Sequence, residues 1–459
     1  MAYEVERKFD KDTRFCIIGG GPAGLCMGMQ LEKKGYKNYT ILEKNNWVGG
    51  KCSSPKYKGR RYEMGAIMGV PSYYAVREAM DFSGMTHGGP KLVRMFHRAN
   101  GEKYDPETAS TPEEGKHLME LQEQIKKLGY ILETKYRGYD VNGHRGVADG
   151  KFDGFDAYNR GIWMTGENPN LKDLALPFKE FCELNEVPLV QEVWILPYTS
   201  FGYGFFDEIP AAYVLKYLDF QTESNFIRGN LWTWTEGTQS IWENLNYALY
   251  NSARLNSDIT KVERKDDKVY VTVNGKVEEY DKIIVTSPLQ YLPDYFDATP
   301  EEKELFSKID YERYDVMAMT LKPGTHRPEL DFFVPENMIP SRLGHIMVSY
   351  NRWKDIDDQV ITTYTIRNHR KMGMISEEEA QKYMLEDMKL CGYEVDEIIN
   401  EESWYYFPHV TPEVYRSGWY DKVEAMQGNL NTYYAGEVMS FGDMDETTQY
   451  SKELAHRFF

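Results

Sequence analysis

The sequence predicts an α/β fold that contains a Rossmann-like dinucleotide-binding unit. Three observations predict it. Residues 14–43 have the pattern of a strand, a glycine-rich turn, a helix and a second strand. Residues 258–288 alternate apolar and polar side chains and then end in an apolar run. Residues 432–459 combine a short strand with an amphipathic helix.

The first of these regions is a βαβ unit. Arg14–Gly19 is predicted as a short buried strand, Ala23–Lys34 as a helix that ends near Gly35, and Tyr39–Glu43 as a second strand. A glycine motif alone is weak evidence of function. Within a strand–turn–helix of this length, however, it indicates a dinucleotide site.

The turn "GGGPAG" has the glycine spacing of such a site. Gly19 permits the tight turn, Gly21 lets the backbone approach a pyrophosphate, and Gly24 lets the helix pack close to the strand. The N-terminus of the helix adds a positive field. Glu43 ends the second strand, where a carboxylate accepts both hydroxyls of an adenosine ribose and repels a 2′-phosphate.

Helix signals recur further along the chain. The segment "TPEE" places Thr111 at a helix cap and Glu114 at the capping-box position, and apolar residues then follow at helical spacing up to Gly129. The same start signal occurs at Thr299–Glu302, and Ser376–Gly392 is another capped amphipathic helix.

Gly138–Asn170 differs from its surroundings because it is rich in Gly, Asp and Asn. We predict a long surface loop or insertion there. Its aromatic residues would also suit a lid, so its role stays open at this stage.

Asp258–Pro288 predicts a three-stranded antiparallel meander. A Lys-Asp-Asp turn and the Asn274-Gly275 turn separate its alternating segments. The apolar run Ile283–Val285 then predicts a buried strand that returns to a sheet.

The end of the chain repeats the strand-then-helix pattern. The segment "TYYAGE" predicts a short strand that ends in Gly436 and Glu437. Asp443 and Asp445 are expected at the positive N-terminus of the closing helix.

Composition narrows the class of protein. The chain has 459 residues, enough for two or three domains, and its formal net charge of −18 disfavours nucleic acids and anionic membranes as partners. There is no targeting signal, and no apolar run reaches the about 20 residues of a membrane span. Five cysteines without a C-x-x-C pair argue against a disulfide framework and fit a cytoplasmic location.

Motifs of several other chemistries are missing. No second G-x-G-x-x-G follows a strand, which disfavours a reductase that draws hydride from NADPH in a second Rossmann domain. There is neither a Ser-x-x-Lys nor a Gly-x-Ser-x-Gly nucleophile motif, and no residue cluster has metal-ligand spacing, so we predict no metal site. His345 and His409 are interpreted as core histidines rather than acid–base groups.

The segments "GGGPAGL", "LEKNNWVGGKC" and "NTYYAGEVMSFG" resemble the FAD-containing amine-oxidase-like superfamily. In that superfamily the Gly49-Gly50 pair and adjacent basic residues touch the pyrophosphate and flavin side. The meander contacts the adenine near Val262, and Gly436-Glu437 places a carboxylate on the ribityl chain. The resemblance implies an amine-oxidase-like fold and a non-covalently bound FAD, because no cysteine for a covalent flavin lies beside Gly436.

From this resemblance we predict a discontinuous, Rossmann-like FAD-binding domain from residues 1–75, 225–295 and 415–459. A mainly helical or cap domain from 76–224, with the inserted loop 138–170, and a mixed-sheet substrate domain from 296–414 complete the predicted fold. The predicted cofactor-binding residues are Gly19, Gly21, Ala23, Gly24, Glu43, Lys44, Gly49, Gly50, Lys51, Arg60, Arg61, Met64, Gly65, Ala66, Ile67, Val262, Gly436 and Glu437.

At a finer level, "GRRYEMGAIMGVPSY", "FGYGFFDEIPAAYVLKYLDF", "LWTWTEGTQ", "WYYFPHV" and "FGDMDETTQYSKEL" resemble the bacterial polyunsaturated fatty acid isomerases. The similarity covers nearly all of the chain except Gly138–Asn170. It implies conversion of linoleic acid or a related acid to a conjugated isomer, such as trans-10,cis-12 conjugated linoleic acid. The flavin would take a hydride from the bis-allylic methylene and return it, so no protein residue is predicted to be catalytic itself.

The same resemblance implies two substrate-positioning residues. Arg94 and Phe226 match the family's Arg/Phe pair at the substrate entrance, with Arg94 as carboxylate anchor and Phe226 as wall or gate. The aromatic segments "FGYGFF" and "WYYFPH" are candidates for the cavity lining, although a buried core cluster would have the same composition.

Two other functions remain open from the sequence. One is an FAD-dependent oxidase or desaturase that acts on an amine or a polyene, and the other is a non-catalytic FAD- or lipid-binding protein. Neither the double-bond isomer nor the oligomeric state follows from the residues.

Overall fold

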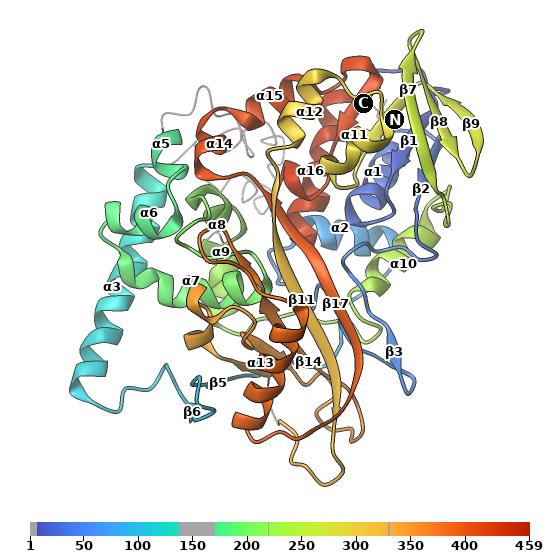
Figure 1. Ribbon diagram of the computed structural model, residues 1–459. Coiled ribbons are helices and arrows are strands. Elements are labelled where there is room, and N and C mark those ends of the chain that lie inside the picture. The colour runs from blue at the N-terminus through green and yellow to red at the C-terminus, as the bar shows by residue number, and fades with distance from the viewer. Residues whose placement is uncertain (1–6, 137–169, 219, 329–330) are drawn as a thin grey trace, which may run out of the picture.

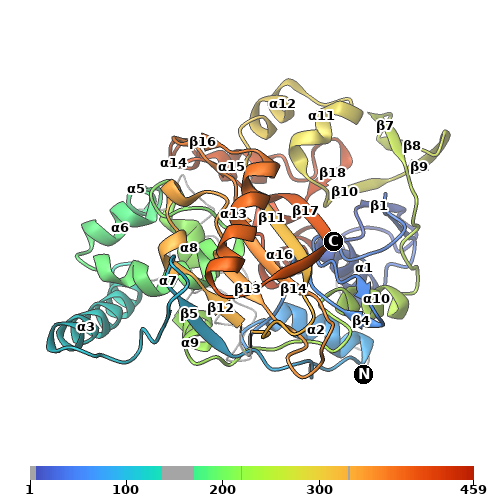
Figure 2. The same cartoon turned by 60° about the horizontal axis from the view of Figure 1, so that its bottom comes forward.

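Strands from three distant parts of the chain form one parallel sheet (Figures 1 and 2). Across the sheet they are β18 (Thr432–Tyr434), β10 (Lys282–Val285), β1 (Phe15–Ile18) and β2 (Tyr39–Leu42). Each adjacent pair is parallel. Nearly all of their residues are buried, as expected for a parallel sheet with both faces covered. The predicted α/β fold class is confirmed.

The computed structural model describes residues 7–136, 170–218, 220–328 and 331–459. The predicted loop 138–170 lies, apart from its last residue, outside the described residues.

Four helices pack in succession beside the parallel sheet. They are α1 (Pro22–Lys33), α16 (Met444–Phe458), α2 (Tyr74–Ser83) and α10 (Gln239–Ala248). α1 contacts α16, α16 contacts α2, and α2 contacts α10. Residues 23–31 of α1 are all buried, so the glycine turn is held between the sheet and α16.

The predicted meander is confirmed and lies at one edge of the molecule (Figure 1). Its antiparallel strands are β7 (Ile259–Lys265), β8 (Lys268–Val273) and β9 (Lys276–Tyr280). Both turns, Asp266–Asp267 and Asn274–Gly275, have positive φ at their two central residues. That backbone matches the twist of paired strands and suits Asn, Asp and Gly.

A second, seven-stranded sheet is dominated by the long antiparallel pair β11 and β17 (Figure 1). Its strands, in order, are β17 (Val395–His409), β11 (Asp310–Leu321), β14 (Ile361–Ile366), β13 (Val348–Tyr350), β12 (Asp331–Phe333), β5 (Arg94–His97) and β6 (Lys103–Tyr104). Since β5 pairs parallel with β12 and the other pairs are antiparallel, the sheet is mixed. α13 (Glu377–Leu390) packs on it through a methionine-rich apolar cluster.

β5 and β6 come from the region 76–224, where the sequence predicts mainly helix. The other strands of this sheet come from residues 310–409, as expected. A strand of four residues has too little sequence for periodicity to identify it, and only its pairing with β12 makes it part of this sheet.

The predicted helices of the middle region are present. Thr111 and Glu114 form the capping box of α3 (Pro112–Thr134), and Thr299 and Ser376 cap their helices in the same way. α3 continues beyond Gly129, where its apolar spacing stops, because Leu132 in its last turn is still buried.

In the described part of the middle region the other α-helices are α5 (Leu171–Leu174), α6 (Phe178–Leu184), α7 (Gln191–Tyr198), α8 (Ala211–Tyr217) and α9 (Phe220–Ile227). Short elements elsewhere are β3 (Lys56–Tyr57), β4 (Arg60–Arg61), α11 (Leu292–Tyr295), α12 (Pro300–Phe306), β15 (Asn368–His369), β16 (Gly373–Met374), α14 (Pro412–Arg416) and α15 (Trp419–Ala425).

Candidate active site

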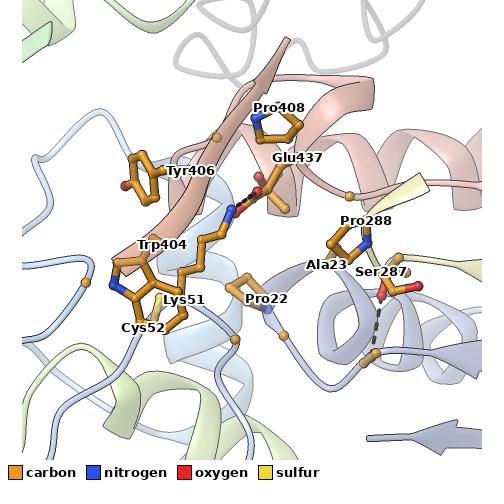
Figure 3. A pocket seen from close by; sticks show the side chains of 18 of the residues that line it. Pro22, Ala23, Lys51, Cys52, Ser287, Pro288, Trp404, Tyr406, Pro408 and Glu437 are labelled. Carbon is orange, nitrogen blue, oxygen red and sulfur yellow. Dashed lines mark hydrogen bonds and ion pairs between the residues drawn. The ribbon is translucent and has the colours of Figure 1, made fainter. Parts of the chain in front are cut away.

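A cavity of about 650 Å³ extends from the carboxyl ends of the parallel strands to the β11–β17 pair. Ile18, Leu42, Thr286 and Ala435, at or just after the ends of the four strands, line one part of it. Open α/β sheets bind ligands outside these strand ends, and the volume lies in the usual range for ligand sites. Figure 3 shows the part of the cavity where α1, β17 and the segment after β18 meet.

The glycine turn forms the first wall. Gly19 has φ +108°, a left-handed conformation that favours glycine, and donates its N–H to the Leu42 carbonyl. A Cβ at Gly24 would lie 1.9 Å from the Gly19 carbonyl oxygen, so the predicted close packing of helix on strand is confirmed. No side chain caps the start of α1, and Gly21 and Ala23 line the cavity there.

Glu43 is held rigidly at the same wall. Its carboxylate is buried and accepts the N–H groups of Gly20 and Asn45, each at 2.7 Å. Glu43 and its neighbour Lys44 both line the cavity. A carboxylate fixed by two amides keeps free lone pairs for a ligand's hydroxyls.

The second glycine segment is attached to the first. Gly49 donates its N–H to the Gly20 carbonyl, and a Cβ at Gly21 would lie 3.6 Å from the Cα of Gly50. Gly50, Gly65, Ala66 and Ile67 line the cavity, whereas Gly49 lies behind them.

Lys51 and Glu437 meet across the cavity wall, although 386 positions separate them. Lys51 Nζ lies 2.5 Å from Glu437 Oε2, and also 5.1 Å from the centre of the Tyr406 ring (Figure 3). Both residues line the cavity, as does Gly436. Lys51 and Glu437, which the sequence predicts separately as cofactor-binding residues, therefore form an ion pair. Their spacing in the sequence did not indicate this contact.

The N-terminus of α16 supplies a further wall. Asp443 caps this helix: its Oδ1 accepts the N–H groups of Asp445 and Glu446 at 2.6 and 2.9 Å. Asp445 instead accepts the N–H groups of Ala75 and Val76, and so caps α2. Burial raises the pKa of both carboxyls, that of Asp445 to about 8.

Aromatic side chains form the wall opposite the parallel sheet. Trp404, Tyr406 and Pro408 are alternate residues of β17 and all line the cavity, while Tyr405 between them is exposed. The segment WYYFPH thus contributes alternate residues rather than a whole run, and the two-residue period of a strand is the signal that identifies them. Of the segment FGYGFF, which is not a strand, Phe201 and Tyr203 line the cavity. Further lining aromatics that sequence reasoning did not single out are Tyr73, Tyr217, Tyr291, Tyr295, Tyr311 and Tyr314.

Arg94 and Phe226 come together in a small second cavity. Arg94 Nη2 donates to the Ile227 carbonyl at 2.5 Å and lies 4.0 Å from Glu107. Phe226 is buried, edge-on to Phe201 and Tyr217. Burial lowers the pKa of Arg94 from its ordinary value.

The two cavities adjoin, since Met68 and Phe201 line both. Arg94 and Leu196 also line a larger outer groove. Arg94 therefore lies between the outer groove and a small apolar cavity that shares a wall with the main cavity.

Several predicted residues do not reach the cavity wall. Arg61 donates to the Ser54 carbonyl and pairs with Glu243, while Arg60 stacks on the Trp353 ring. Met64 and Val262 are buried without lining the cavity. Their assignment to the cofactor stays a prediction.

The two candidate acid–base histidines make contacts of a structural kind. His345 bonds to Asp387 and stacks on Tyr383, and buried His409 bonds to the Phe407 carbonyl. Neither lines the main cavity. Within the described ranges no group of three or more His, Cys, Asp or Glu side chains is placed to hold a metal.

The family "flavin containing amine oxidoreductase" matches residues 22–442. The chain belongs to this family. FAD is therefore its cofactor.

Two curated proteins are similar to this chain over about two thirds of its length. The chain is 23% identical over 345 residues to the polyenoic fatty acid isomerase of Ptilota filicina, covering 68% of this chain and 66% of that protein. It is 22% identical over 314 residues to a 4,4'-diapophytoene desaturase of Staphylococcus aureus, covering 65% of this chain and 61% of that protein. The chain thus spans at most about two thirds of these curated relatives.

Among solved structures, a CLA-producing fatty acid isomerase from P. acnes is 48% identical, with a TM-score of 0.90 and coverage of 98% of this chain and 100% of that chain. A putrescine oxidase bound to putrescine is 14% identical, with a TM-score of 0.66 and coverage of 97% and 98%, and shares the fold.

The cavity of this flavin-containing family member fits FAD. The glycine turn exposes the uncapped start of α1 to an anionic pyrophosphate, and Glu43 presents a carboxylate to a ribose. Glu437 follows the end of β18 and lines the cavity together with Tyr406 of the aromatic wall. Among the described parts of the chain, no helix is both long and apolar enough to cross a membrane.

Proposed function

We propose that this protein is an FAD-dependent isomerase that shifts a double bond of linoleic acid or a related polyunsaturated fatty acid into conjugation. The observation that carries the proposal is the succession of adjacent hollows from the outer groove and the small apolar cavity at Arg94 to the main cavity beside the glycine turn. These hollows offer a cation for a carboxylate, apolar walls for an acyl chain, and a cofactor cavity at the inner end. The 48% identical isomerase structure supports the same substrate class.

The predicted cofactor-binding residues Gly21, Glu43, Lys51 and Glu437 hold the flavin in this proposal. When bound, the flavin supplies hydride abstraction and hydride return, so that the reaction has no net redox change. The protein's own part is to hold a bent chain in register and to exclude water.

In this proposal the aromatic wall stabilises the positive charge that develops on the diene. A bis-allylic methylene that loses a hydride leaves a cation shared over five carbons, and aromatic faces attract cations through their quadrupoles. Tyr203, Tyr217, Tyr314 and Tyr406 line the cavity and are buried, so their faces are available without competing water. Arg94 fixes the carboxylate end and Phe226 forms the wall beside it.

Anaerobic incubation of the FAD-loaded protein with linoleate tests the proposal. The expected result is conjugated-diene absorbance and a conjugated product on chromatography, without peroxide when oxygen is admitted. Peroxide formation with turnover would favour an oxidase, and a more unsaturated product would favour a desaturase. Failure to convert any fatty acid of a panel, with flavin at full occupancy, would reject the isomerase.

A further inference from the structure

Three apolar residues that recur along α3 are not buried as a core face would be. Leu118, Leu121 and Ile125 follow one another at helical spacing and therefore share one face of the helix. All three are half-buried and line the outer groove, which has a volume of about 1690 Å³. Leu128, further along the same helix, is buried. The first half of the stripe thus forms a wall of a hollow, and the proposed cofactor site does not account for it.

The opposite wall of the hollow is apolar too. Val193, Ile195 and Leu196 of α7 are half-buried and line the same groove. α3, at the outer edge of the molecule, lies beside α7 (Figures 1 and 2), and His117 Nε2 is 2.8 Å from Glu192 Oε2 across the two helices. This part of the groove, between the apolar residues of α3 and those of α7, is called the trough below.

The trough adjoins the small cavity at Arg94. Arg94 and Leu196 line both the groove and that cavity. The small cavity has a volume of about 20 Å³, enough for about one water molecule and far too little for an acyl chain. A fatty acid that approaches from the groove therefore meets a closed cavity, and the trough is the apolar surface open to it.

We propose that the trough binds the chain of a free long-chain fatty acid before the acid enters the inner cavities, with the carboxylate at Arg94. The inference rests on the proposed function and goes beyond it, because it adds a separate loading step. It also assigns a binding surface to α3 and α7, which contribute no residue to the cofactor cavity.

Carboxylates at the sides of the trough determine the orientation of the acid. Glu113 and Glu114 of α3 and Glu192 of α7 line the groove, so they repel an anionic head group. Arg94 has the exposed Glu107 at 4.0 Å, a distance at which a closer carboxylate can replace it. The carboxylate of the acid is therefore attracted to Arg94, while the uncharged chain lies between the helices.

A single acyl chain suits the trough better than other occupants do. Between two apolar walls the chain loses water along its length, and each buried methylene strengthens binding about fourfold. A second copy of this protein would bring its own net charge of −18 against the same carboxylates. A flat lipid surface would not reach side chains that are half-buried between two helices.

Rapid mixing of the FAD-loaded protein with monomeric linoleate tests the loading step. A change in flavin absorbance reports entry into the main cavity. If a trough complex forms first, the rate of this change levels off as linoleate increases, and the half-saturating concentration measures the affinity of the trough. In Leu121→Asn we expect that concentration to rise about four- to sixteenfold, since one or two methylenes lose an apolar contact. The limiting rate and kcat should stay within about twofold, because the loss concerns binding alone.

The matched control is Met119→Asn. Met119 lies on the same helix, is 60% exposed and does not line the groove. The control makes the same kind of change in the same helix and should keep the half-saturating concentration of the parent protein. Val193→Thr, a change of similar shape on the opposite wall, should raise this concentration as Leu121→Asn does. It replaces Leu121→Asn if thermal unfolding shows that this variant does not fold.

Several results would overturn the proposal. One is a rate that rises linearly with linoleate and is the same in Leu121→Asn. Another is an equal effect of Leu121→Asn and Met119→Asn, or a lower limiting rate at an unchanged half-saturating concentration, since either would mean that the helix acts through the fold.

Two further measurements identify a different occupant. A dimer that dissociates in Leu121→Asn would make the trough an interface between copies, and binding of the protein to phosphatidylcholine vesicles that is lost in Leu121→Asn would make it a lipid-docking surface. Either overturns the proposal. A parent protein whose rate levels off as expected but that makes no conjugated diene rejects the isomerase function and leaves the fatty acid site in place.

Discussion

At the scale of single residues, Arg94 lines both the outer groove and the small apolar cavity behind it. Its guanidinium is partly buried, donates to the Ile227 carbonyl and, among the residues that the structure describes, has the exposed Glu107 at 4.0 Å as its one ion-pair partner. A cation with unused donors and reduced solvation is well placed to bind a carboxylate.

We predict that Arg94→Ala weakens binding of free linoleic acid by tenfold or more, about the value of a charge-assisted hydrogen bond, while binding of its methyl ester changes much less. Calorimetric or kinetic titration with both ligands checks this. Arg98→Ala is the control, because Arg98 lines the outer groove but is paired with Glu336. Equal losses for acid and ester would remove Arg94 as the carboxylate anchor.

At the scale of elements, the site depends on how closely α1 packs on β1 and on how α16 joins α2. The first junction has no room for a side chain at Gly24. The second is made by Asp445, which belongs to α16 and caps α2.

Gly24→Ala should destabilise the protein by about 1–3 kcal/mol and reduce its FAD content, because the added methyl forces α1 away from the Gly19 carbonyl. Thermal unfolding and the flavin-to-protein absorbance ratio measure both effects. Gly28→Ala, in the same helix, would meet the flexible end of Ile41 at 3.0 Å instead of backbone. If both variants lose stability equally, close packing at Gly24 is not the cause.

The raised pKa of Asp445 predicts a specific pH dependence of the free energy of unfolding. Burial raises its pKa from 3.8 to about 8, so between these values the folded state holds a proton that the unfolded state has released. The contribution of Asp445 to stability is therefore largest below about pH 4 and decreases as pH rises to about 8.

Denaturant unfolding of parent and Asp445→Asn proteins from pH 5 to 8 tests this. Asparagine can still accept the two amides but does not titrate, so the fall in stability with pH should be shallower in the variant. Parallel pH profiles would mean that Asp445 titrates near its ordinary value in the folded protein.

At the scale of the whole molecule, the cofactor cavity lies where the parallel sheet, the long β11–β17 pair and α16 meet. Residues from the beginning, the middle and the end of the chain line it, for example Gly19, Thr286 and Glu437. A ligand bound at such a junction stabilises every part that contributes to it.

Removal of FAD should therefore lower the unfolding temperature of the whole protein by several degrees. Re-addition of FAD at about 100 times its dissociation constant should raise the free energy of unfolding by about 2.7 kcal/mol, since FAD binds the folded state. Differential scanning calorimetry of apo- and FAD-loaded protein checks this. An unfolding temperature independent of FAD concentration would contradict a site built from all three chain regions.

The sequence by itself determined the parts of this protein that depend on neighbours in the chain. The turn at Gly19–Gly24, the helix caps at Thr111, Thr299 and Ser376, and the I′ turns of the meander were all predictable. The reason is that backbone conformation and capping hydrogen bonds are set within a few residues. The order of these motifs, together with the family resemblance, was enough to predict FAD.

Only the tertiary structure decided which distant side chains meet. It paired Lys51 with Glu437, directed Arg61 to Glu243 instead of the cavity, and turned alternate residues of β17 toward the cavity. These outcomes depend on the path of the chain over hundreds of residues and on burial, neither of which is encoded in local spacing.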